Sequence, residues 1–126
     1  DLYVSRLVDG IYQAPENLGP AINTEANELA PFIATDESFL IFTAMDWPGG
    51  LGGLDLYISF RDPQGEWTEP LNMGEPVNSP GSDLCPHLSP DGAYLFWNSQ
   101  REGNSDNYWM DAGVLDDLRR RALGER

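Results

Sequence analysis

Short apolar runs alternate with turn-forming residues along most of the chain. The apolar runs are rich in β-branched and aromatic residues, and Gly, Pro, Asp and Asn separate them. This pattern is typical of antiparallel strands joined by tight turns. It predicts nine strands, at 1–8, 11–15, 29–34, 39–44, 55–61, 66–70, 84–88, 94–99 and 106–110.

Two of these strands, at 39–44 and 94–99, are almost continuously apolar. Such strands are expected where both faces of a sheet are covered. The segment Ser-Pro-Asp-Gly at 89–92 predicts the turn that leads into the second of them. Pro fixes φ there, Asp bonds to nearby backbone, and Gly takes the strained position.

The chain repeats itself at an offset of 54 or 55 residues. Asp-Leu-Tyr-Val-Ser at 1–5 recurs as Asp-Leu-Tyr-Ile-Ser at 55–59, and more loosely as Asp-Asn-Tyr-Trp at 106–109. Two further blocks keep the same order: 12–24 recurs as 67–79, and 29–42 recurs as 84–97. Four strands in a period of about 50 residues fit one blade of a β-propeller.

The last residues change character. Val114, Leu115, Leu118 and Ala122 recur at helical spacing. We expect a short helix that caps the chain, since terminal elements of repeat folds commonly cover the last apolar face. The alternative is a helix that recognises a partner.

The segment from Pro86 to Tyr108 resembles the PD40 unit, the WD40-like β-propeller repeat of TolB-type proteins. It contains P-x-x-S-P-D-G, a hydrophobic strand, S-x-R-x-G-x-x-D and an aromatic residue. The earlier copy, Pro31 to Tyr57, is a degenerate match with an insertion at 45–54. The resemblance implies that Asp55 and Asp106 begin third strands and that Trp67 lies on a fourth.

The resemblance therefore implies an all-β fold of about two four-stranded antiparallel blades in an incomplete ring, with a short C-terminal helix. The expected divisions are a partial blade with its third and fourth strands and a linker at 1–28, a complete blade and linker at 29–83, three strands at 84–111, and the helix at 112–126. Two and a quarter blades cannot close a ring. The chain is then either the end of a longer gene or a homo-oligomer, through three copies or a two-fold exchange of strands.

Charge and composition exclude several classes of function. The chain has 21 acidic residues against seven arginines and no lysine, and four of the arginines follow residue 118. A basic surface for nucleic acid or for an anionic membrane is therefore not expected. No apolar run is long enough to span a bilayer. One cysteine and one histidine exclude an internal disulfide or a multi-histidine metal site within the chain.

No catalytic constellation is evident, so we predict no catalytic residues and no required cofactor. Cys85 and His87 align with Ala30 and Phe32 of the earlier copy, which predicts core or half-buried strand positions. Asn104 and Asp106 are weak candidates for calcium, because they offer hard oxygen ligands in a tight loop. The alternative is that Asp106 caps the turn and pairs with Arg101.

The insertion is the most promising binding loop. It is glycine-rich and carries Asp46 and Trp47, which could stack on a sugar or anchor a peptide. Alternatively, Trp47 packs against a neighbouring blade. Five other residues are predicted to serve the repeat structurally: Asp55, Asp91, Gly92, Arg101 and Asp106.

Propellers host many activities, so the fold decides little about function. The expectation is a non-enzymatic binding or scaffold module that recognises a protein in the bacterial envelope, in the periplasm or secreted. The alternatives are a propeller that belongs to an enzyme (a peptidase gate, a glycosidase or a lyase) and a carbohydrate-binding module. The ligand is a protein or a glycan in these hypotheses.

Overall fold

The computed structural model describes residues 1–125, which are mostly strand with one helix at the C-terminal end. The strands are β1 (Tyr3–Val4), β2 (Leu7–Val8), β3 (Ile11–Tyr12), β4 (Glu16–Asn17), β5 (Asn27–Ile33), β6 (Phe39–Met45), β7 (Leu54–Phe60), β8 (Leu71–Asn72), β9 (Asp83–Leu88), β10 (Tyr94–Ser99) and β11 (Asp106–Asp111), and the helix is α1 (Val114–Leu123). The all-β class with a short C-terminal helix is confirmed.

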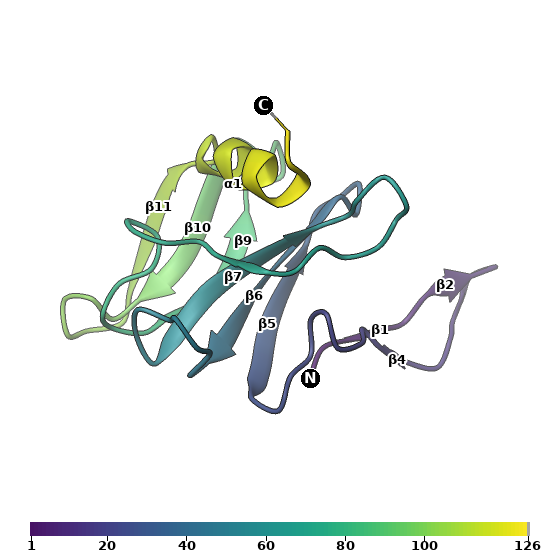
Figure 1. Cartoon of the computed structure of the whole chain (residues 1–126), viewed down its shortest axis with the longest axis horizontal. Helices are drawn as coiled ribbons and strands as arrows, with labels where there is room; N and C mark the ends of the chain where they lie inside the picture. The colour runs from purple at the N-terminus through teal and green to yellow at the C-terminus, as the bar shows by residue number, and fades with distance from the viewer. Residues whose placement is uncertain (126) are drawn as a thin grey trace.

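The strands form antiparallel sheets that follow one another along the molecule (Figure 1). The middle sheet has the order β5-β6-β7-β8, and the last sheet has the order β9-β10-β11. Residues 1–24, which we call the N-terminal unit, contribute the pairs β1-β4 and β2-β3. None of these sheets closes on itself.

The middle sheet is built on the long pairing of β6 with β7, from Phe39 opposite Phe60 to Met45 opposite Leu54. Every residue from Leu40 to Ala44 is at most 3% exposed. The predicted burial of both faces is therefore confirmed for this strand. The register between β5 and β6 shifts at Ala30, whose φ of 49° lies in the left-handed region, and this bulge bends the strand.

The last sheet repeats the same design. The Ser-Pro-Asp-Gly turn joins β9 to β10, and Gly92 has a φ of 73°. A second bulge lies at Cys85, with a φ of 56°, at the position of Ala30 in the middle sheet. Only one face of β10 is buried, however, and Tyr94 is 42% exposed. The predicted burial of both faces is wrong for 94–99, because no other sheet within residues 1–125 covers the second face.

Three predicted strands differ from those observed. The strand expected at 11–15 is only β3, at Ile11–Tyr12, which pairs with β2, and the partner of β1 is β4. The expected strand at 1–8 is split into β1 and β2, because β1 has no partner within the described residues comparable to β6. The fourth strand of the middle sheet is β8, which follows the predicted 66–70. Trp67 makes only an isolated bridge to Arg61, whose guanidinium lies 3.9 Å from the centre of the indole. Pro70 has no N–H to donate to a ladder, so pairing resumes only after it.

The two copies of the sequence repeat make equivalent hydrogen bonds through an asparagine, which we call the asparagine clamp. Asn23 accepts from the N–H of Leu2 at 2.6 Å and donates to the carbonyl of the same residue at 2.8 Å. Asn78 makes the equivalent pair of bonds to Leu56, at 2.7 and 2.9 Å. In each copy the asparagine lies in the linker that follows a sheet and ties that linker back to the preceding strand.

Two apolar clusters join the units. One lies between the N-terminal unit and the middle sheet, with Leu2 and Ile22 against Phe42. The other lies between the middle and last sheets, and β9 runs across β5, β6 and β7. Helix α1 covers the second cluster with Leu115 and Leu118, as a capping helix does (Figure 1).

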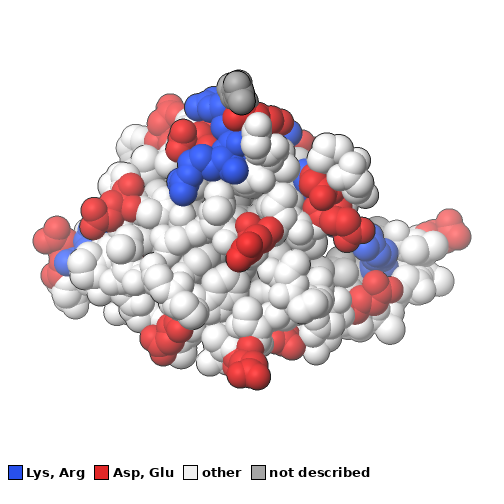
Figure 2. Space-filling view, viewed as in Figure 1, with Lys and Arg blue, Asp and Glu red and all other residues white. Residues whose placement is uncertain are grey.

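The predicted C-terminal segment is helical from 114 to 123, and Arg126 lies outside the described residues. Among the described residues, no helix has the length and apolar character needed to cross a membrane. Acidic side chains are scattered over the visible face, whereas the arginines gather mainly near α1 (Figure 2).

Candidate functional site

The insertion between β6 and β7 is a structured loop. The carboxylate of Asp55 accepts the backbone N–H of Leu51 at 2.6 Å and that of Gly52 at 3.2 Å. Asp55 is 2% exposed, so the loop wraps around a buried acid at the start of β7. A Cβ at Gly52 would overlap the carbonyl oxygen of Gly81, so this loop touches the linker before the last sheet.

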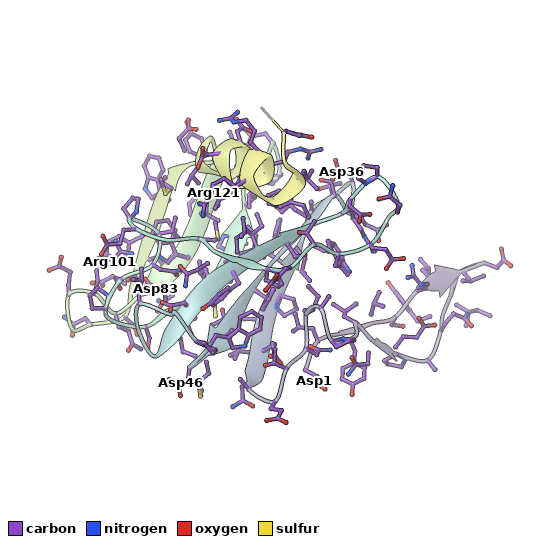
Figure 3. The ribbon with its side chains drawn as sticks, viewed as in Figure 1. Asp1, Asp36, Asp46, Asp83, Arg101 and Arg121 are labelled. Carbon is purple, nitrogen blue, oxygen red and sulfur yellow. The ribbon has the colours of Figure 1, made fainter. Side chains whose placement is uncertain are left out.

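The two candidate binding residues of the loop have different surroundings. Asp46 is exposed and has a φ of 53° (Figure 3). Trp47 is half-buried, and its ring centre lies 4.6 Å from that of Tyr57 and 5.6 Å from that of Phe42. Its indole N–H donates to Glu28 at 3.2 Å. Trp47 therefore packs on the middle sheet, the sheet to which its own loop belongs, whereas the alternative role placed it against a neighbouring blade. A binding role for Asp46 or Trp47 stays a prediction.

In the second repeat, Arg101 occupies the place that Trp47 has in the first. Its guanidinium lies 4.7 Å from the ring centre of Tyr108, which corresponds to Tyr57. It forms an ion pair with the buried Asp83 at 3.2 Å, and Asp83 corresponds to Glu28 (Figure 3). Arg101 also donates to the carbonyls of Pro76 and Val77, at 2.8 and 2.6 Å. The first repeat thus uses an indole where the second uses a guanidinium.

This comparison corrects one interpretation and identifies a residue that the sequence analysis missed. Arg101 pairs with Asp83, whereas the interpretation paired it with Asp106, which is exposed at the start of β11. The missed residue is Glu28, which is 4% exposed and also accepts the N–H of Thr24 at 2.9 Å. The signal was present, since an acid recurs at 28 and 83 within the repeat.

A cavity of about 980 Å³ adjoins Trp47, between the end of the N-terminal unit and strands β7 and β8 of the middle sheet. Tyr57 lines it, and the phenolic oxygen of Tyr57 has no hydrogen-bond partner in the described structure. Burial raises the pKa of Tyr57, and the nearby Asp55 acts in the same direction. Glu25 and Glu69 supply the carboxylates of the rim. The site is therefore aromatic and acidic, with no arginine or lysine among its lining residues.

The remaining predicted positions serve turns. Asp91 accepts the hydroxyl of Ser89 at 2.6 Å and the N–H of Ala93 at 3.0 Å, which holds the pKa of Asp91 below its usual value. Gly92 supplies the left-handed residue of the same turn. Asn104 and Asp106 are exposed, and residues 1–125 contain no group of three or more His, Cys, Asp or Glu placed to hold a metal.

The expectation for Cys85 and His87 is wrong. Cys85 is exposed, because the bulge gives it a left-handed backbone in the middle of β9. His87 is exposed too, and its ring stacks on that of Phe96 at 5.1 Å with an interplanar angle of 10°.

His87 belongs to a surface that the sequence analysis did not predict. His87, Tyr94, Phe96 and Trp109 share the uncovered side of the last sheet, and we call this surface the aromatic face. Strand register places Phe96 opposite both His87 and Trp109. The ring centres of Tyr94 and Trp109 lie 5.3 Å apart. Trp109 is 65% exposed, so the aromatic face is open to solvent.

Comparisons with known proteins leave the family open. A scan against protein-family models gives no match, and a search of curated proteins gives no significant match.

Proposed function

We propose that the chain is a run of PD40-type propeller blades that serves as a non-enzymatic scaffold for protein recognition. We place it in the bacterial periplasm or among secreted proteins, following the resemblance of its repeat. The observation that carries the proposal is the aromatic face, a solvent-exposed set of large rings on a rigid sheet. Exposed apolar patches of this kind mark interaction surfaces in soluble proteins, and aromatic residues dominate the centres of protein interfaces.

The repeated architecture supports the assignment to propeller blades. The middle sheet has four antiparallel strands, and its neighbours stack on both of its faces through apolar clusters. Stacked units that each contact their neighbours are the pattern of repeat proteins and of propeller blades. The bulges at Ala30 and Cys85 and the asparagine clamps at 23 and 78 occur in both copies.

The use of the buried polar groups supports a scaffold over an enzyme. Asp55 holds the insertion loop, Asp83 holds the linker at Ser79, and Asn78 holds β7 at Leu56. Each of these side chains is at most 2% exposed and is engaged by backbone groups. Their hydrogen bonds shape the chain, and the proposal assigns no reaction to them.

The experiment is site-specific photo-crosslinking in cells of the source bacterium. A photoreactive phenylalanine replaces Trp109, and a matched control places it at Leu51, which is 43% exposed on the insertion loop. The proposal expects adducts with a defined protein from position 109 and none from position 51. Absence of any adduct at 109, or the same adducts from both positions, would overturn it. Mass spectrometry of the adduct identifies the partner.

A glycan-binding function is the second candidate, favoured by the cavity beside Trp47. Its aromatic wall and its rim carboxylates, Glu25 and Glu69, match the stacking and hydroxyl-binding groups of sugar sites. A glycan array tests it, with the double change Glu25→Ala and Glu69→Ala as the variant, since both residues are exposed. Binding that is lost in the variant supports this candidate, and an empty array removes it.

A further inference from the structure

We infer that the cavity beside Trp47 binds a guanidinium group, which comes either from an arginine side chain or from a small guanidino compound. The inference goes beyond the proposed function, because it concerns a different part of the molecule from the aromatic face. All the residues that line this cavity lie between positions 20 and 72, so its walls are formed by residues well inside the sequence.

The second repeat shows how this part of the fold holds a guanidinium. Arg101 lies over the ring of Tyr108, 4.7 Å from its centre, and pairs with the buried Asp83 at 3.2 Å (Figure 3). It also donates to two carbonyls of the linker, those of Pro76 and Val77, at 2.8 and 2.6 Å. A tyrosine ring, a carboxylate and linker carbonyls therefore form a guanidinium site in this repeat.

The first repeat places equivalent groups around an open cavity. Tyr57, which corresponds to Tyr108, lines the cavity, and so does Ala21, which corresponds to Pro76. Trp47 stacks on the tyrosine where the second repeat has its guanidinium, with the two ring centres 4.6 Å apart. Because the indole fills that place, the ligand lies against Trp47 within the cavity, and indole is the best aromatic partner for a cation.

The charges around the cavity favour a cation. Glu25 and Glu69 are exposed at its rim, and its lining residues include no arginine or lysine. Burial raises the pKa of Tyr57, and the negative charge of the nearby Asp55 adds to this effect. A positively charged ligand is therefore attracted to this site and an anion is repelled from it.

Tyr57 also has a polar atom that needs a partner. The residue is 4% exposed, and its phenolic oxygen forms no hydrogen bond within residues 1–125. Buried polar groups in folded proteins are normally hydrogen-bonded, so an unpaired one beside a cavity indicates a site for a ligand. A guanidinium has five N–H donors in one plane, so it can donate to this oxygen while a face of the plane lies on an aromatic ring.

The rings and carboxylates of this cavity also suit a neutral sugar, the second candidate above. Two observations favour the guanidinium. The second repeat already holds one with equivalent residues, and both charged groups of the rim are anionic.

The test is an NMR titration that follows the indole N–H of Trp47, whose signal is assigned with Trp47→Phe. The probes are N-acetylarginine methylamide, its lysine analogue, which keeps the charge, and its citrulline analogue, which keeps the shape without the charge. The arginine probe should give saturable shifts with a Kd of about 1 mM, on the order expected for one small head group. The lysine probe should bind at least about threefold more weakly and the citrulline probe at least about tenfold more weakly, since neither offers a charged planar fork.

Methylguanidine is the fourth probe and distinguishes the two sources of the group. Tighter binding of the capped arginine assigns the site to an arginine side chain of a peptide. Equal binding of methylguanidine assigns it to a small guanidino compound. Both results support recognition of the guanidinium itself.

Charge variants test the role of the rim. The double change Glu25→Gln and Glu69→Gln should weaken binding of the arginine probe about tenfold, since each exposed ion pair contributes a factor of about three. Glu37→Gln is the matched control and should bind like the wild type. It removes the same charge from the turn before β6, whereas Trp47 follows the other end of that strand. Circular dichroism confirms that each variant is folded.

Three results would overturn the inference. One is the absence of a saturable shift of the Trp47 indole with the arginine probe up to about 20 mM, far above the expected Kd. Another is lysine or citrulline binding as tight as arginine binding, because the planar charged group would then not be recognised. The third is an unchanged affinity in the double variant.

This inference and the proposed functions fail separately. Crosslinking at Trp109 reports on the aromatic face alone. Glycan binding that depends on Glu25 and Glu69, without arginine binding, keeps the second candidate and rejects the guanidinium site. Arginine binding with an empty glycan array does the reverse.

Discussion

Replacing Asn78 with alanine tests the asparagine clamp that ties each linker to the strand before it. Asn78 is 1% exposed, accepts the N–H of Leu56 at 2.7 Å, and donates to the carbonyl of Leu56 and to Asn72, both at 2.9 Å. The carbonyl of Leu56 keeps a second partner, the N–H of Met73 at 3.0 Å. The N–H of Leu56 would lose its acceptor in Asn78→Ala, and Leu56 is fully buried.

The magnitude follows from these contacts. An unpaired buried N–H costs about 1–3 kcal/mol, and each of the two other lost bonds contributes about 1 kcal/mol. Asn78→Ala should therefore lower the free energy of unfolding by about 4 kcal/mol. With a urea slope of about 2 kcal/mol per molar, the unfolding midpoint should fall by about 2 M.

The repeat supplies the control. Asn23 makes the same clamp to Leu2, at 2.6 and 2.8 Å, but it is only half-buried and lies in the N-terminal unit. Water can replace part of what is lost there, so Asn23→Ala should cost about 1–2 kcal/mol. Urea unfolding followed by circular dichroism and by tryptophan fluorescence measures both variants. Equal losses, or a loss below about 1 kcal/mol for Asn78→Ala, would refute the reasoning.

Three further predictions concern turns and loop contacts. Glu37 has a φ of 60°, so Glu37→Gly should raise the free energy of unfolding by about 1 kcal/mol in a thermal melt, and no gain would contradict this. Gly52→Ala should destabilise the fold by several kcal/mol, on the order of a severe core change, because its Cβ would overlap the carbonyl oxygen of Gly81. Gly53→Ala is the matched control: the nearest atom to its Cβ lies 3.6 Å away, so it should be neutral in the same urea assay. The pKa of Asp91 lies below its ordinary value of 3.8, so the stability that its carboxylate contributes to the turn is complete above pH 3.8 and is lost as the pH falls through the lower pKa of the folded state. Ser89→Ala should raise the pKa of Asp91 measured by NMR titration. An unchanged pKa would show that the Ser89 hydroxyl is not the cause.

Much of the fold could be predicted from the sequence because its signals are local. The Ser-Pro-Asp-Gly turn before Tyr94 and the aspartates before the third strands depend on a few adjacent residues. The repeat extended these local signals from one copy to the other, as the bulges at Ala30 and Cys85 show. The observed β7 begins at Leu54 and β11 at Asp106, within one residue of the prediction.

The exposed face of β10 could not be predicted, because burial depends on a neighbouring unit and not on the strand itself. Phe96 and Trp109 have the composition of core residues, and they would be core residues under another sheet. The contacts of Trp47 could not be predicted for a related reason: its hydrogen-bond partner Glu28 lies 19 residues away in the sequence, on β5. The recurring acid at 28 and 83 was the available signal, and its meaning depended on knowing which side chains reach it.

The asparagine clamp also sets an order for folding on the ribosome. Asn78 comes 22 residues after Leu56, and the bonds between them close the outer edge of the middle sheet. Chains emerge from the ribosome N-terminal end first, and units fold as they are released. The middle sheet can therefore take its final form only once the linker to the last sheet has left the exit tunnel. The hydrogen bonds that complete the middle sheet therefore come from the linker that leads into the last sheet.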